Sequence, residues 1–114
     1  MKFSANLSFM FVREAPDLIQ RIKLAAAAGF RGVEFAYPYD VDVSALAAAR
    51  EAAGVEQVLL NSWPGCVNTG ELGIAIHPPR QQEFLDKLDL SLVYLKVTFI
   101  IRHAFTQGAG WPIS

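Results

Sequence analysis

The chemistry-bearing residues of this sequence lie where short apolar segments end. Glu34 lies within the apolar run 33–36, and Tyr37 and Tyr39 follow it directly. A carboxylate on a buried strand is costly unless it is paired, bound to a metal or facing a polar cavity. Glu34 therefore either lines a substrate site at the end of its strand or pairs, inside the protein, with a basic residue from another part of the fold.

Asparagines end the two other apolar segments that favour strands. Asn6 and Asn61 carry neutral amides, which could hold a carboxylate or hydroxyl of a substrate. They could equally bond the backbone of their own loops, as asparagine readily does. The aromatic rings of Tyr37, Tyr39 and Trp63 either wall a pocket or pack loops against the sheet.

Four further polar or reactive residues give weaker signals. Arg80 either binds an anionic group near a helix start or lies solvated in a first turn. His77 and His103 have no partners at metal-ligand spacing, so no metal site is predicted. Cys66 has no base or basic cluster nearby, which predicts an inert thiol.

Composition bounds the class of protein. The chain has 114 residues, 53% of them hydrophobic, which is enough for one domain with a real core. A formal net charge of −1 predicts neither a nucleic-acid nor a membrane-surface partner. A single cysteine favours a reducing, cytoplasmic setting. The apolar N-terminus is interrupted by Ser4, Asn6 and Ser8, which favours a first strand over a signal peptide.

Hydrophobic periodicity predicts alternating strands and helices. A strand spacing of about 30 residues is typical of βα repeats with parallel strands and right-handed crossovers. Asn6, the loop 37–39 and Asn61 should then cluster at the carboxyl end of one sheet. The continuous apolar run 58–60 predicts a strand that is covered on both faces. The predicted strands are 2–7, 32–36 and 57–61. The predicted helices open at residues 15–17, after a cap at residue 42 or 44, and at residues 78–80, and they run to the residues before Gly29 and Gly54 and to Leu95.

Capping residues delimit the first two helices. Gly29 and Gly54 follow runs of helix formers and are predicted stops. Asp42 or Ser44 can cap the start of the second helix. Arg21 falls on the polar side of the first helix and is predicted to face solvent.

The last part of the sequence departs from this order. No Gly, Asn or Pro separates the third helix from the β-branched run 97–101. We therefore divide the chain into residues 1–96 and a divergent, irregular tail, 97–114. The tail is predicted to be poorly anchored, or to extend a strand or helix with few contacts. The long segment 66–79 is predicted to be a functional loop.

A set of short motifs resembles hydroxypyruvate isomerase, a family of xylose-isomerase-like TIM barrels. The resemblance covers about residues 1–95, in order and with matching spacing. It implies an α/β fold made of the first three βα units of a (β/α)8 barrel, an incomplete barrel within this sequence. The motifs are residues 3–8, 29–39, 59–61, 70–73 and 79–81.

The resemblance also implies an activity. The family interconverts hydroxypyruvate and tartronate semialdehyde through an enediolate, with two glutamates as acid and base. A divalent metal is often used in the superfamily. The glutamates and the metal-binding carboxylates lie on later strands, so neither catalytic residues nor metal ligands are carried over to this chain. The candidates for contacting a small hydroxy-keto acid are Asn6, Glu34, Tyr37, Tyr39 and Asn61.

The sequence leaves rival functions open. In the first, the chain is an isomerase by descent that is inactive alone. In the second, it is a non-catalytic binding module, for example for its own full-length relative. In the third, it is an intact small α/β domain with an unrelated binding role. The oligomeric state is not predicted.

Overall fold

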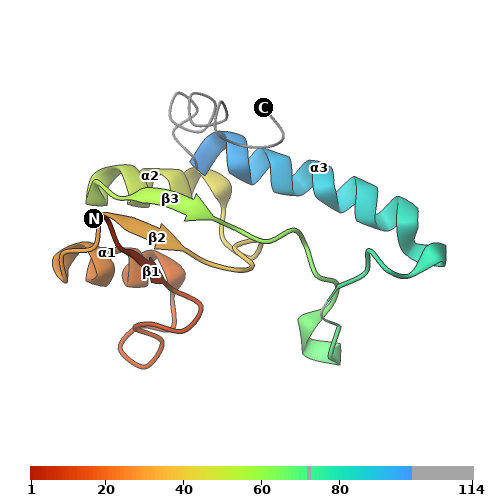
Figure 1. The fold of residues 1–114 in the computed structure, drawn as a ribbon, viewed down its shortest axis with the longest axis horizontal. Helices are drawn as coiled ribbons and strands as arrows, with labels where there is room; N and C mark the ends of the chain where they lie inside the picture. Colours follow the sequence, from red (N-terminus) through yellow and green to blue (C-terminus); the bar gives the residue numbers. More distant parts are fainter. Residues whose placement is uncertain (72, 99–114) are drawn as a thin grey trace.

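The computed structural model describes residues 1–71 and 73–98, and their elements alternate as the sequence predicts (Figure 1). The strands are short and lie within or close to the predicted ranges. The strands are β1 (Ser4–Asn6), β2 (Gly32–Glu34) and β3 (Glu56–Leu59), the helices are α1 (Leu18–Ala27), α2 (Val43–Ala53) and α3 (Gln81–Thr98), and the 3-10 turns are η1 (Val67–Thr69) and η2 (Pro78–Arg80).

The strands form one parallel sheet in the order β1-β2-β3. Ala5 pairs with Val33, and Val33 pairs with Gln57. A register shift between Val33 and Glu34 then places Glu34 opposite Leu59. The predicted α/β class with parallel, sequentially adjacent strands is confirmed.

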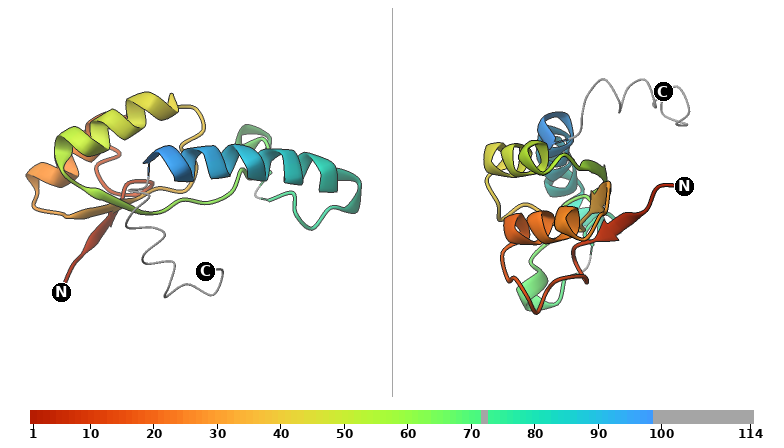
Figure 2. Two further views of the ribbon diagram at one scale, coloured as in Figure 1. Left: turned by 90° about the horizontal axis from the view of Figure 1, so that it is seen from above. Right: turned by 90° about the vertical axis from the view of Figure 1, so that its left-hand side faces the viewer.

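The core lies between the sheet and the two helices α1 and α2, which cover the same face (Figure 2). Apolar side chains on alternate positions of β1 and β2 point into this layer, as the period of two requires, and β3 contributes the buried Gln57. Each leucine or isoleucine that is fully buried there stabilises the fold by about 1.5–3 kcal/mol. The core residues are Ala5, Leu7, Ile22, Ala25, Val33, Phe35, Leu46, Val55 and Tyr94.

The opposite face of the sheet carries small residues on β1 and β2 and an apolar side chain on β3. A Cβ built on Gly32 would lie 3.3 Å from Val58 and 3.4 Å from Ser4, so these residues share that face. Val58 is 38% exposed and Leu59 is 45% exposed. The prediction that the third strand is covered on both faces is therefore wrong for the described residues. The reason is that α1 and α2 cover one face of the sheet, while α3 extends past it (Figure 2).

The predicted helix stops are confirmed. Gly29 and Gly54 have φ angles of 98° and 69°. After each, the next N–H bonds to the carbonyl five residues back, the pattern of a Schellman cap. Asp42, rather than Ser44, caps α2 by accepting from a backbone N–H at 3.0 Å. Asp17 caps α1 in the same way.

Helix α3 runs two residues beyond Lys96 and ends at Thr98. Thr98 is fully buried, and its hydroxyl donates to the carbonyl of Tyr94. Val97 and Thr98, which we assigned to the tail, are therefore helical. The remainder of the predicted tail, 99–114, lies outside the described residues. No helix in the described part of the chain is long and apolar enough to cross a membrane.

Candidate functional site

The carboxyl ends of the three strands meet at one edge, as predicted. The N–H of Leu7 donates to the carbonyl of Glu34 at 2.7 Å, and the N–H of Asn61 donates to that of Ala36 at 2.9 Å. These bonds extend the ladder beyond the strands themselves. The segments that carry Asn6, Tyr37 and Asn61 are thereby brought together at the position where α/β proteins bind ligands.

A hollow of about 290 Å³ lies at this end. Three residues singled out from the sequence line it, namely Tyr37, Asn61 and Trp63. Asn6, Glu34 and Tyr39 are not among its lining residues. The rest of the lining comes from the segment after β3 and from the start of α3: Ser62, Pro64, Gly73, Ile74, Ala75 and Phe84.

Tyr39 joins loops together instead of walling this hollow. Its hydroxyl donates to the carbonyl of Asn61 and lies 2.8 Å from the hydroxyl of Ser91 on α3. Its ring meets the ring of Tyr94 edge-on, with 5.2 Å between centroids. Burial raises the pKa of the Tyr39 phenol. Of the two interpretations of Tyr39, loop packing fits these contacts.

Asn6 also bonds locally. Its Oδ1 accepts from the N–H of Ser8 at 3.0 Å, and the Ser8 hydroxyl accepts from the N–H of Ala36 at 2.9 Å. The two side chains thus connect the ends of β1 and β2. The capping role that asparagine commonly has in loops accounts for Asn6 in this structure.

Glu34 is half-buried at the end of β2. Within residues 1–71 and 73–98 its carboxylate has neither a hydrogen bond nor an ion pair. The basic partner that one interpretation requires is thus not found in the described part of the chain. Glu34 stays a candidate for contacting a ligand.

Arg21 organises the loop between β1 and α1. Its guanidinium donates to the carbonyl of Ala15 at 2.7 Å, of Pro16 at 2.9 Å and of Leu7 at 3.1 Å. The prediction that Arg21 faces solvent is wrong, because the side chain folds back onto the loop and is half-buried. The two ends of the loop are therefore held by one side chain. Phe9 projects from this loop and is 81% exposed.

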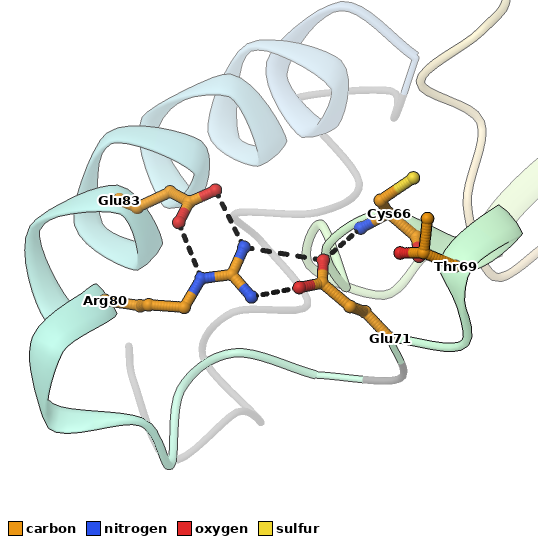
Figure 3. Close-up of polar contacts among 5 residues, drawn as sticks. All are labelled: Cys66, Thr69, Glu71, Arg80 and Glu83. Atoms are coloured by element: carbon orange, nitrogen blue, oxygen red, sulfur yellow. Dashed lines mark hydrogen bonds and ion pairs between the residues drawn. The ribbon is translucent and has the colours of Figure 1, made fainter.

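Arg80 lies between two carboxylates (Figure 3). It donates to both oxygens of Glu71, and to Glu83 at 2.8 and 3.0 Å. Hydrogen bonds from Arg80 lower the pKa values of both carboxyls, and the backbone N–H of Cys66 lowers that of Glu71 further. The prediction that Arg80 is a solvated first-turn side chain is wrong, because its guanidinium is paired with two carboxylates. Binding of an anionic group by Arg80 stays a prediction.

This cluster is only partly predictable from residue types. Arg80 and Glu83 have the i,i+3 spacing of a helical ion pair, which pattern analysis can detect. Glu71 lies nine positions before Arg80 in a segment without regular periodicity, so its partner could not be inferred. The contacts of Arg21 are all to backbone carbonyls, which every residue has, so residue types do not reveal them.

The described residues do not form a metal centre. No group of three or more His, Cys, Asp or Glu side chains in that part of the chain is placed to hold an ion. Within residues 1–71 and 73–98 there is thus no donor set that fits a divalent metal.

Sequence comparison identifies relatives of this chain. The chain is 47% identical over 96 residues to a hydroxypyruvate isomerase relative from Danio rerio. It is 40% identical over 96 residues to the hydroxypyruvate isomerase of Escherichia coli strain K12. The matched part of the chain is homologous to hydroxypyruvate isomerase. It is also 43% identical over 93 residues to the 2-oxo-tetronate isomerase of Haemophilus influenzae. No family model matches the chain.

The match is extensive for this chain and partial for its relatives. It covers 84% of this chain in the first two comparisons and 82% in the third. The chain spans about a third of the length of these relatives, between 34% and 36%.

A solved structure supports the fold assignment. The crystal structure of AP endonuclease, family 2, from Brucella melitensis superimposes with a TM-score of 0.80 and 43% sequence identity. The superposition covers 85% of this chain and 37% of that protein. The predicted xylose-isomerase-like TIM-barrel architecture, present here as three βα units, is thus confirmed.

Proposed function

We propose that this chain supplies one wall of the substrate site of an isomerase for small hydroxy-keto acids, of the hydroxypyruvate or 2-oxo-tetronate type. The observation that carries the proposal is the hollow at the strand ends, lined by Tyr37, Asn61 and Trp63. Homology to proteins named as these isomerases supports the substrate class. A cytoplasmic setting belongs to the same proposal.

The chemistry assigns limited tasks to these residues. Isomerisation requires a base that removes a proton beside a carbonyl, and an acid that returns it to the neighbouring carbon. The Asn61 amide and the Ser62 hydroxyl are suited to bond the oxygens of the substrate. Tyr37 and Trp63 line the same hollow with aromatic rings. Glu34 lies outside the lining of the hollow, and even a single carboxylate at the site could not also act as a second acid from the opposite face.

We therefore propose that residues 1–114 do not catalyse the reaction alone. Each general acid or base typically contributes about 10²–10⁴-fold, so a site without the pair retains little activity. The alternative role for the isolated chain is a non-catalytic binding module. Its formal net charge of −1 gives no electrostatic footprint for DNA, so the endonuclease activity for which the Brucella protein is named is not extended to it.

The test is a turnover assay. Purified chain is incubated with hydroxypyruvate and a divalent metal, and tartronate semialdehyde is followed over time. We expect no product above the protein-free control. Turnover that disappears in Glu34→Gln would overturn the proposal of inactivity and would place a complete site within this chain.

A further inference from the structure

The hollow is built from segments that are separate along the chain. One wall consists of residues 61–64 and 73–75, and the other includes Phe84 on α3. Between residue 75 and α3 the chain forms one short 3-10 turn, η2, so side-chain contacts are needed to fix the two walls relative to each other. Arg80 lies between them, immediately before α3.

Glu71 closes the first wall into a compact loop. Its own N–H donates to the carbonyl of Cys66 at 3.1 Å, and its carboxylate accepts from the N–H of Cys66. The N–H of Gly73 donates to the carbonyl of Pro64 at 2.8 Å, which ties the two halves of the wall together. The carboxylate of Glu71 is thus part of the loop and also reaches out of it.

Gly65 makes room for this carboxylate. It has a φ of 99°, and a Cβ built there would lie 2.9 Å from the Cβ of Glu71. Gly70 has a similar φ of 87°, but nothing lies within 4 Å of its Cβ position. An alanine at Gly70 therefore carries only the cost of a left-handed backbone, whereas an alanine at Gly65 also displaces Glu71.

Arg80 connects Glu71 to the second wall. A planar guanidinium can bond two carboxylates in fixed directions, which an ammonium cannot do. One edge faces Glu71, and the other faces Glu83, the residue directly before Phe84 (Figure 3). The contact of Glu71 with Arg80 therefore links the two walls, beside the contact of Lys87 on α3 with the Trp63 ring.

We propose that Arg80 and Glu71 are positioning residues that hold the two walls of the hollow in register, so that Asn61 and Trp63 can meet a small hydroxy-keto acid. The substrate class in this proposal rests on the proposed function. The positioning itself does not, because it concerns the ligand-free chain. Neither residue is proposed to touch the substrate.

The experiment uses Trp63 as a local reporter. Trp111 is the other tryptophan, so Trp111→Phe leaves Trp63 as the single indole in the chain. In this background, acrylamide quenching of Trp63 and amide hydrogen exchange at Glu71 and Gly73 are measured without ligand. The variants are Arg80→Gln and Arg80→Lys.

Matched controls separate positioning from general damage. Arg13→Gln removes an arginine that has neither a hydrogen bond nor an ion pair within the described residues. Gly65→Ala and Gly70→Ala are compared in the same background. Far-UV circular dichroism and the urea midpoint report on the overall fold.

We expect faster quenching and faster exchange in Arg80→Gln and Gly65→Ala, an intermediate result in Arg80→Lys, and little change in Arg13→Gln and Gly70→Ala. Unchanged quenching and exchange in Arg80→Gln would overturn the proposal. So would equal effects of the two glycine variants. If Arg80→Gln lost the circular dichroism of the wild type, the comparison of quenching and exchange between Gly65→Ala and Gly70→Ala would decide the proposal.

Hydroxypyruvate titration then separates the two proposals. If the wild-type chain binds hydroxypyruvate, Arg80→Gln should raise the Kd by about two- to fivefold, the range expected for an ion pair of modest strength. A wild-type chain that does not bind hydroxypyruvate would count against the proposed function, while the ligand-free measurements would still decide the positioning role.

Discussion

Two loops at the same edge of the sheet are each held by one half-buried arginine, but the partners differ. Arg21 donates to three backbone carbonyls in the loop between β1 and α1. Arg80 donates to the carboxylates of Glu71 and Glu83 in the segment between β3 and α3. Carbonyls are neutral at every pH, whereas carboxylates titrate and are screened by salt.

This contrast in partners determines which loop responds to pH and salt. The pKa values of Glu71 and Glu83 are lowered in the folded chain, so ionisation of these groups stabilises it. This stabilisation is complete above the ordinary carboxyl pKa of about 4.3 and is lost as pH falls through the lowered values. The loop held by Arg21 has no such dependence. Because the carboxylate cluster is partly exposed, salt screens it, and its contribution to the free energy of unfolding is small at high ionic strength.

The largest expected effect comes from Arg21→Met. It leaves three loop carbonyls without their donor, and we expect a loss of about 2–3 kcal/mol in the free energy of unfolding. Urea denaturation at pH 5 and pH 7 should give the same loss. A loss that differs between these pH values would contradict the distinction between the two loops, and Arg13→Gln is the control for removal of one positive charge.

Tyr39→Phe should have an intermediate effect. It removes the hydrogen bond to the carbonyl of Asn61 and the contact with Ser91, for an expected cost of about 1 kcal/mol. Because the pKa of Tyr39 is raised, its contribution is complete below a pH of about 10 and is lost as the pH rises through the folded value. Alkaline denaturation should therefore narrow the difference between the variant and wild type, and a constant difference would contradict this assignment.

Arg80→Gln should have the smallest effect on global stability. Its partners are partly exposed, and such ion pairs stabilise weakly. The difference from wild type should be present at pH 7 and should shrink as the pH falls below about 4.3, and it should also shrink in about 1 M salt. Thermal denaturation in a series of buffers measures this. An equal difference at all these conditions would mean that Arg80 acts through packing alone.

Much of the fold was predictable because its signals are local. Gly29 and Gly54 mark helix ends through backbone conformation, and Asp42 marks a helix start through a bond to a nearby N–H. The meeting of Tyr37 and Asn61 followed from the parallel order of the strands.

Other parts could not be predicted because their partners lie far apart in sequence or lack a side-chain signature. Tyr39 bonds to residues 22 and 52 positions away. The exposure of Val58 and Leu59 depends on what covers the second face of the sheet, which apolar patterning does not reveal. Contact of Glu34 with a ligand stays a prediction.

The most direct test of the proposed substrate wall is a titration of the Trp111→Phe chain with hydroxypyruvate, followed by Trp63 emission. We expect a saturable change with a Kd of about 1 mM, an affinity suited to part of a site. Asn61→Asp keeps the size of the side chain but adds a negative charge, so it should weaken binding of this anion, whereas Arg13→Gln should not. A linear, non-saturating response, or equal binding by the Asn61→Asp chain, would contradict the assignment of this hollow as a substrate wall.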